Sequence, residues 1–283
     1  MFAQVRIMKL SVVIPAHNEA GCIAQTVSDL HQRLAAENIE HELVVVNDNS
    51  SDDTPRILAD LQTSIVQLRV VHNAPPHGFG FAVRCGLESF TGDAVAIYMA
   101  DASDRPEDLV SFFRVMENKD VDCVFGSRFT RGGKTFDYPF LKLVLNRIAN
   151  SFIQVLFGLR YNDTTNAFKL YRRHVIEGLK PLLSHHFNLT VELPLKSIVR
   201  GYSYAIVPNH WINRKSGESK LRIQEMGSRY LFIVLYCLIE KLLSRGDYHR
   251  LKHQVVVDDN ANTSQTFVAE TSSTVGVASH DVA

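Results

Sequence analysis

The chain has 283 residues, 46% of them hydrophobic, and its 30 basic and 30 acidic residues give a formal net charge of +0 at pH 7. This length predicts about two domains or one large α/β domain with additions. Because the charges cancel, no global field draws the chain to nucleic acid, and an anion site must be local. The four cysteines are far apart and lack metal-ligand spacing, which is typical of reduced thiols in a cytosolic protein.

Strands and helices alternate along the first half of the chain. Apolar runs predict strands at residues 10–15, 42–46, 66–71, 94–98 and 121–125. Helical periodicity predicts helices at residues 20–37, 54–62, 81–90 and 106–118. This alternation predicts an α/β fold with a mostly parallel central sheet and helices on both of its faces.

Polar side chains gather where four of these strands end. In chain order they are His17, Asn18 and Glu19; Asn47, Asp48 and Asn49; Asp101 and Asp104; and Ser127 and Arg128. The carboxyl ends of parallel strands meet at one edge of a sheet, where ligands bind. We therefore expect a nucleotide-type crevice there. Ser103 and Asp104 have an alternative role as caps of the helix that follows, but capping does not explain Asp101.

The two common phosphate-binding fingerprints are absent. No Gly-x-x-x-x-Gly-Lys-Ser/Thr segment occurs, and the first strand ends in Pro-Ala-His-Asn-Glu rather than in a glycine-rich turn. Gly78-Phe-Gly80 precedes a predicted helix but lacks the full dinucleotide-binding spacing, so we interpret it as a tight turn with close helix packing. An ATPase or a dinucleotide dehydrogenase is thus disfavoured, and a nucleotide held by side chains and a metal ion remains.

Two apolar helical segments follow the α/β region, at residues 138–159 and 230–243. The second is too short to cross a bilayer, and Lys142 and Arg147 interrupt the first, so we expect no spanning helix. Residues 1–9 are too few and too broken by Arg6 and Lys9 for a secretory signal. The segments form either a surface for a lipid chain and the headgroup layer, or a cover for the sheet, or a dimer interface. After Arg250 a polar composition predicts a disordered tail.

Five segments, in order, resemble family 2 glycosyltransferases, in particular the polyprenyl-phosphate hexose synthases of the dolichol-phosphate mannose synthase type. They are residues 12–19, residues 44–54, the acidic segment around Asp101, Gly126-Ser-Arg128 and residues 211–220. The resemblance implies a GT-A fold and an inverting transfer from a nucleotide diphosphate sugar that depends on Mg²⁺ or Mn²⁺. It divides the chain into a catalytic domain (1–221), an amphipathic helical extension (222–250) and a tail (251–283).

The same resemblance assigns the donor site. The implied nucleotide contacts are Pro15, His17, Glu19, Asn47, Asp48, Ala100 and Asp101, and the implied metal ligands are Asp101, Ser103 and Asp104. Two departures stand out. The family has two carboxylates where this chain has Asn47 and Asp48, which leaves the choice of base open. Met99 replaces the first aspartate of the family's Asp-Ala-Asp-x-Gln motif, which removes one metal ligand.

For the acceptor, the resemblance implies a phosphate site. Arg214 and Lys220 match the family's phosphate-binding pair, with Arg128 and Lys169 as further candidates; Asp101, Arg128, Arg214 and Lys220 are the implied catalytic residues. Without the upstream motifs, the segment around Arg214 and Lys220 would instead be interpreted as a solvated basic loop.

The acceptor determines which catalytic groups are needed. A sugar hydroxyl needs a carboxylate base, whereas a lipid monophosphate arrives ionised and needs cations. The sequence offers a cationic segment and no obvious base, so we predict transfer of a hexose, mannose from GDP-mannose as the best guess, to a polyprenyl phosphate at the cytoplasmic face of the membrane. The alternatives are a transferase that uses another nucleotide sugar such as UDP-glucose and a soluble hydroxyl acceptor, with Asp163 or Glu192 as base, and a nucleotide-sugar binding protein without turnover. A homo-oligomer is possible.

Overall fold

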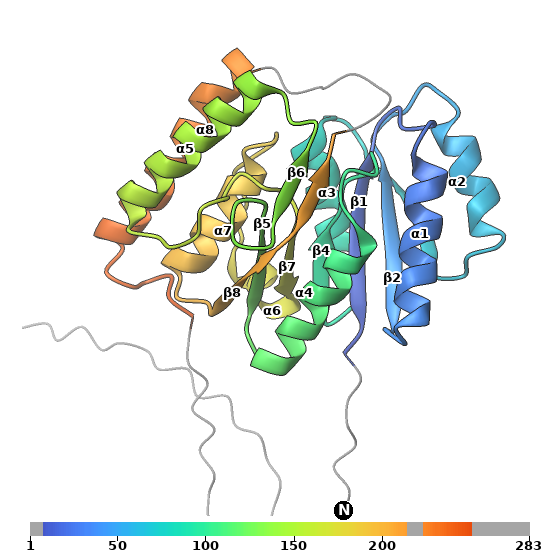
Figure 1. Ribbon diagram of the computed structural model, residues 1–283, viewed down its shortest axis with the longest axis horizontal. Helices are drawn as coiled ribbons and strands as arrows, with labels where there is room; N and C mark the ends of the chain where they lie inside the picture. Colours follow the sequence, from blue (N-terminus) through green and yellow to red (C-terminus); the bar gives the residue numbers. More distant parts are fainter. Residues whose placement is uncertain (1–7, 214–222, 251–283) are drawn as a thin grey trace, which may run out of the picture. The chain divides into compact units, whose positions relative to one another are not determined.

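The structure is a computed structural model that describes residues 8–213 and 223–250, without the side chains of residues 223–226 (Figure 1). The predicted tail and the predicted domain boundary at residue 221 lie outside these ranges and stay predictions. The described residues belong to one compact unit that ends at Arg250.

A seven-stranded sheet forms the centre of the molecule, in the order β3-β2-β1-β4-β7-β5-β8. The strands are β1 (Leu10–Ala16), β2 (His41–Asn47), β3 (Leu68–His72), β4 (Ala94–Ile97), β5 (Cys123–Ser127), β7 (Lys169–Arg172) and β8 (Tyr204–Pro208). β7 runs antiparallel to β4 and β5, and the other paired strands are parallel. The mostly parallel sheet is therefore confirmed. The inserted antiparallel strand was not predicted.

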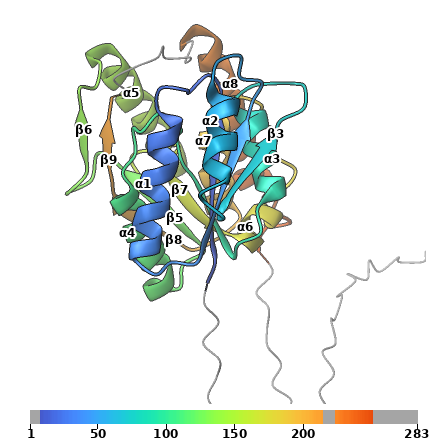
Figure 2. The same ribbon diagram turned by 90° about the vertical axis from the view of Figure 1, so that its right-hand side faces the viewer.

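Helices cover both faces of the sheet, as predicted. They are α1 (Ile23–Ala36), α2 (Thr54–Gln62), α3 (Phe79–Ser89), α4 (Pro106–Lys119), α6 (Arg173–Gly178) and α7 (Leu189–Val199). Because side chains alternate along a strand, Val12 and Ile14 of β1 join the core under α1, α2 and α4, while Val13 joins the core under α3, α6 and α7. Figure 2 shows α4 and α6 on opposite sides of the sheet.

A small second sheet lies beside the end of β4. It pairs β6 (Lys134–Phe136) with β9 (His210–Ile212) in parallel. Trp211 of β9 also forms a β-bridge with Asp104, and the Ile212 backbone N–H donates to the Ser103 carbonyl at 2.9 Å. These contacts fix the acidic segment against a strand from a distant part of the chain.

The two predicted apolar segments form α5 (Phe140–Phe157) and α8 (Ile223–Leu243), which run side by side (Figure 1). Ile153 and Phe157 of α5 and Ile233 and Val234 of α8 share a third core with α7. The buried Arg200–Glu240 ion pair, with Nε 2.7 Å from Oε1, fastens α8 to the end of α7. Within the described residues, α5 is long and apolar enough to cross a membrane by length and composition alone, contrary to the expectation that neither apolar segment is.

The segment Gly78-Phe-Gly80 forms the turn into α3, as predicted. Gly78 has a φ of +138°, which side chains rarely adopt, and it precedes the first residue of the helix. A Cβ on Gly80 would lie 2.3 Å from the carbonyl carbon of His185. Glycine at position 80 therefore lets α3 pack directly on the backbone of a distant loop.

Replacing Gly80 with alanine should lower the free energy of unfolding by about 1–3 kcal/mol, because the methyl group would force two backbone segments apart. Gly227→Ala is the matched control: it lies in α8 with no atom within 4 Å of the added Cβ, and should leave the stability unchanged or slightly raised. Urea denaturation measures both, and an equal response of the two variants would contradict the packing argument.

Candidate active site

A cavity of about 1150 Å³ opens at the C-terminal edge of the sheet and extends to α5 and α8. We name one part of it the donor half. This part is lined by Pro15 at the end of β1 and by residues that follow β1 to β4, among them His17, Glu19, Asp48, His77, Met99, Asp101, Ser103 and Asp104. Its acceptor half is lined by Arg128 and by residues of α5, α7 and α8. The expected crevice at the strand ends is therefore present. Of the predicted nucleotide contacts, Asn47 and Ala100 do not line it.

The turns after β1 and β2 hold each other in place. His17 Nδ1 lies 2.6 Å from the Asp48 carbonyl oxygen, and the Glu19 backbone N–H donates to Thr54 Oγ1 at 2.9 Å. Asn47 is turned away from the cavity: its amide nitrogen lies 3.3 Å from His72 Nδ1, and its oxygen accepts the Ser50 N–H. Position 47 is where the family has its first carboxylate and this chain has Asn47. Because the Asn47 side chain contacts His72 and Ser50 and not the cavity, this difference leaves the cavity wall unchanged.

The acidic segment after β4 is a buried, tightly turned loop. Asp101, Ser103 and Asp104 are all buried, Ala102 has a φ of +56°, and the Ser103 N–H donates to Asp101 Oδ1 at 3.2 Å. Burial and the charge of Asp101 raise the pKa of Asp104 to about 8. Because helix α4 is capped by Arg105 without a side-chain hydrogen bond, the alternative role of Ser103 and Asp104 as helix caps is wrong.

This segment fits a divalent ion that is shared with substrate. Ser103 Oγ is buried and has no hydrogen-bond partner within residues 8–213 and 223–250. This oxygen is therefore available as a metal ligand beside the carboxylates of Asp101 and Asp104. The described residues contain no cluster of three His, Cys, Asp or Glu side chains able to hold a metal ion. Mg²⁺ commonly binds through one or two carboxylates and completes its shell with substrate phosphates and water. Asp101, Asp104 and Ser103 match that pattern.

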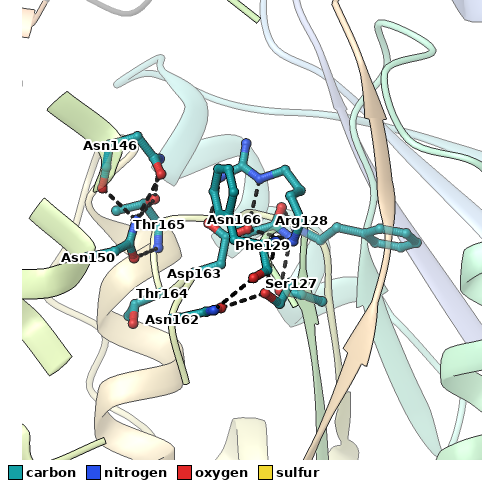
Figure 3. A network of polar contacts seen from close by, with 12 residues as sticks. Ser127, Arg128, Phe129, Asn146, Asn150, Asn162, Asp163, Thr164, Thr165 and Asn166 are labelled. Atoms are coloured by element: carbon teal, nitrogen blue, oxygen red, sulfur yellow. Dashed lines mark hydrogen bonds and ion pairs between the residues drawn. The ribbon is translucent and has the colours of Figure 1, made fainter. Parts of the chain in front are cut away.

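Arg128 is held at the end of β5 by a buried ion pair (Figure 3). Its Nε and Nη2 donate to the two oxygens of Asp163 at 2.8 and 2.7 Å, and its backbone N–H donates to the same carboxylate at 3.0 Å. Burial alone would lower the pKa of Arg128, but the charge of Asp163 outweighs it and raises that pKa. The third guanidinium nitrogen, Nη1, has no hydrogen bond within the described part of the chain, and Arg128 lines the cavity.

The loop that carries Asp163 is itself anchored on both sides. Asn162 bonds Ser127 at 2.6 Å and the Phe129 carbonyl at 3.1 Å, and Thr165 accepts hydrogen bonds from Asn146 and Asn150 of α5 (Figure 3). This network couples the end of β5 to α5. It fixes the cationic side chain at the boundary between the two halves of the cavity.

Lys169 has a different position from the one predicted. It is buried, it does not line the cavity, and its ammonium donates to the carbonyls of Thr164, Asn166 and Thr190. Burial lowers its pKa to about 7, against the opposing charge of Asp163. Three carbonyl partners use all its donors, so the geometry argues against a phosphate contact and favours a structural role.

Two cations on the acceptor half were not predicted as site residues. Lys142 of α5 and Arg229 of α8 line the cavity with Arg128. Their signal in the sequence was a single basic residue within or beside an apolar helical pattern, which is indistinguishable from an ordinary surface charge. Arg214 and Lys220 lie outside the described residues. Asp163 and Glu192 are fully buried, do not line the cavity, and are paired with Arg128 and Lys196.

Replacing Asp104 with asparagine should raise the free energy of unfolding at pH 8 by on the order of 2–4 kcal/mol and have a much smaller effect at pH 4. The folded chain binds the Asp104 proton more tightly than the unfolded chain, whose carboxyl has a pKa near 3.8. The wild type therefore loses stability as the pH rises from 4 towards 8. Urea denaturation without divalent ions tests this, with Asp137→Asn on the surface as control; equal pH slopes for both variants and the wild type would contradict it.

Comparison with known proteins agrees with this geometry. Residues 11–179 match the family described as glycosyl transferase family 2. The chain is 29% identical over 216 residues to a polyprenol monophosphomannose synthase of Mycolicibacterium smegmatis, covering 74% of this chain and 80% of that protein. It is also 29% identical over 225 residues to a dolichol-phosphate mannosyltransferase of Pyrococcus furiosus, covering 76% of this chain and 60% of that one.

Among solved structures, the chain resembles glucosyl-3-phosphoglycerate synthase from Mycobacterium tuberculosis in complex with Mn²⁺, uridine diphosphate and glucosyl-3-phosphoglycerate. The TM-score is 0.61 at 18% identity, over 83% of this chain and 80% of that chain. The same enzyme was also crystallised with Mg²⁺ and uridine diphosphate. This likeness confirms the GT-A fold. Because the family match spans more than half of its length, the chain belongs to glycosyl transferase family 2 and is a glycosyltransferase.

Proposed function

We propose that this glycosyltransferase moves a hexose from a nucleotide diphosphate sugar to a polyprenyl phosphate. The observation that carries the proposal is the division of one cavity into an acidic half and a half that is both cationic and apolar. The first suits a metal-bound diphosphate, and the second suits a phosphate with a hydrocarbon chain. The two relatives named above are a polyprenol monophosphomannose synthase and a dolichol-phosphate mannosyltransferase, which favours mannose, with GDP-mannose as the expected donor.

On the donor half, Asp101, Asp104 and Ser103 would hold Mg²⁺ or Mn²⁺ together with the diphosphate. Such an ion supplies Lewis-acid stabilisation of the negative charge on the departing nucleotide. Pro15, His17, Glu19 and Asp48, which line the cavity on the side of β1 and β2, would then surround the nucleoside. Loss of the first family carboxylate at Met99 leaves enough oxygen ligands, because substrate oxygens complete the shell.

On the acceptor half, the cations Arg128, Lys142 and Arg229 would bind the lipid phosphate. Arg214 and Lys220, which lie outside the described residues, are proposed as further partners of this phosphate. Asn213 and Gly227, which flank them in the sequence, line the cavity. The phosphate arrives ionised, so these cations need only orient it for in-line attack on the anomeric carbon, which inverts the configuration. Apolar side chains of α5 and α8, such as Phe152, Ile153 and Val234, continue the wall along the hydrocarbon.

A hydroxyl acceptor fits this half less well. Among the described lining residues, those from α5, α7 and α8 include no aspartate or glutamate. Asp163 and Glu192, the two acids considered as a base, are buried in ion pairs away from the cavity. A phosphate acceptor needs no carboxylate base, so it fits the acceptor half better than a hydroxyl acceptor does.

The outer faces of α5 and α8 supply a surface for the lipid bilayer. Both helices expose large apolar side chains that do not line the cavity, among them Phe140, Leu141, Ile148 and Val155 on α5 and Phe232, Ile239, Leu242 and Leu243 on α8. Phe157, near the end of the first apolar segment, does not belong to this surface, because it packs in the core with α7 and α8. We propose peripheral attachment at the cytoplasmic face, with the acceptor half open towards the membrane.

Lys142→Gln should raise the KM for polyprenyl phosphate about tenfold and change the KM for the donor less than twofold, because it removes one charge–phosphate contact. Lys220→Ala should act in the same direction. Steady-state transfer from GDP-mannose measures both constants. Lys119→Gln, on the surface at the end of α4, is the matched control. A larger effect on the donor constant than on the acceptor constant would contradict the assignment.

Replacing Ile148, Val155 and Phe232 together with glutamine should abolish co-sedimentation with liposomes that contain anionic lipid, because it removes exposed apolar area from the proposed membrane face. Val66→Gln removes an apolar side chain that is more exposed than any of these three and lies outside α5 and α8, and it should bind like the wild type. Unchanged binding of the triple variant would rule out this face. A wild type that binds no liposomes and forms a dimer, lost in the variant, would assign the face to self-association.

A further inference from the structure

The loop between β3 and α3 presents a histidine to the donor half of the cavity. His77 Nδ1 lies 3.1 Å from Asp48 Oδ1, and the residue lines the cavity. The same carboxylate accepts hydrogen bonds from Asn73 Nδ2 at 2.7 Å and from the Gly78 N–H at 2.8 Å. These three donors occupy three of the roughly four lone-pair positions of Asp48. Its carboxylate is therefore largely committed to holding the loop.

The position of His77 along the sheet edge assigns it to the nucleoside. The acidic segment that would bind the diphosphate follows β4, whereas His77 contacts the residue that follows β2, and the intervening strand is β1. Two strand spacings amount to roughly 10 Å. A donor whose diphosphate lies beside Asp101 and whose sugar points to Arg128 must extend its nucleoside in the opposite direction, towards His77.

The hydrogen bond to Asp48 determines what His77 offers to a ligand. An ionised carboxylate only accepts, so Nδ1 carries the hydrogen and Nε2 of the neutral ring is an acceptor. Nε2 has no hydrogen bond within residues 8–213 and 223–250. We propose, resting on the proposed function, that His77 reads the base of the donor nucleotide by accepting a ring N–H, with Asp48 as its positioning residue.

This proposal selects a class of bases. Guanine and uracil carry a hydrogen on the ring nitrogen of their pairing edge, whereas adenine and cytosine carry a lone pair there. An acceptor at Nε2 therefore favours guanine or uracil nucleotides and disfavours adenine nucleotides, since two acceptors would face each other. Asn47 does not line the cavity, so it leaves this selection to His77.

Calorimetric titration with GDP, UDP, ADP and inorganic pyrophosphate, each with MnCl₂ at pH 8, tests the inference. His77→Ala and His77→Asn should weaken the preferred nucleotide about tenfold and leave ADP and pyrophosphate nearly unchanged. Asparagine can keep the contact to Asp48 but does not reach the position of Nε2, so it separates reading of the base from support of the loop. His77→Gln, which reaches that position with an amide oxygen, should recover part of the preference.

His174→Ala is the matched control, because His174 also pairs with an aspartate, Asp122, and lies outside the cavity. It should bind all four ligands like the wild type. Unchanged base preference in His77→Ala, with nucleotide binding intact, would overturn the inference alone. An equal loss for pyrophosphate would assign His77 to the phosphates and overturn it as well. A wild type that binds no nucleotide would overturn the proposed function together with the inference.

Discussion

The parallel pairing of β1, β2 and β4 is the constraint on which the site depends. Leu10 of β1 lies opposite both His41 and Ala94, so the three strands start in register and their following turns meet at one edge. The polar residues after β1, β2 and β4 are far apart in the sequence, and this register brings them together. β9 then closes the edge by pairing Trp211 with Asp104. Backbone contacts with β9 therefore hold the segment that carries the buried acids.

Charge along the cavity changes sign where β7 separates β4 from β5. On the β4 side, Asp101 and Asp104 share a buried loop that is costly to ionise without a cation, as the raised pKa of Asp104 indicates. On the β5 side, Asp163 accepts hydrogen bonds from two of the three guanidinium nitrogens of Arg128, Nε and Nη2. This pairing fixes the orientation of the guanidinium group and leaves Nη1 to donate to a ligand. The two ends complement a reaction in which one phosphate group leaves and another attacks. Neither end needs a general base, in keeping with the proposed chemistry.

The sequence predicted the elements whose pattern is local. Residues 54–62 form α2 as predicted, and the turn at Gly78 and Gly80 is present for the predicted reason. β7 was missed because its four residues, Lys169–Arg172, include two charged ones, whereas the equally short β4 is apolar throughout. The buried position of Lys169 was not foreseen, because the sequence pattern does not distinguish a buried lysine from one that binds a ligand. Lys142, Arg229 and His77 were missed because their place depends on how α5, α8 and the β3–α3 loop meet the sheet.

The central claim is that the donor diphosphate and a divalent ion bind together beside Asp101, at the end of β4. Anomalous diffraction from crystals soaked with MnCl₂ and GDP tests it directly. The account predicts one manganese peak within coordination distance of the Asp101 carboxylate and of the diphosphate oxygens, with the nucleoside extending towards β2. A manganese peak or a diphosphate located away from Asp101, with that carboxylate left uncoordinated, would contradict it.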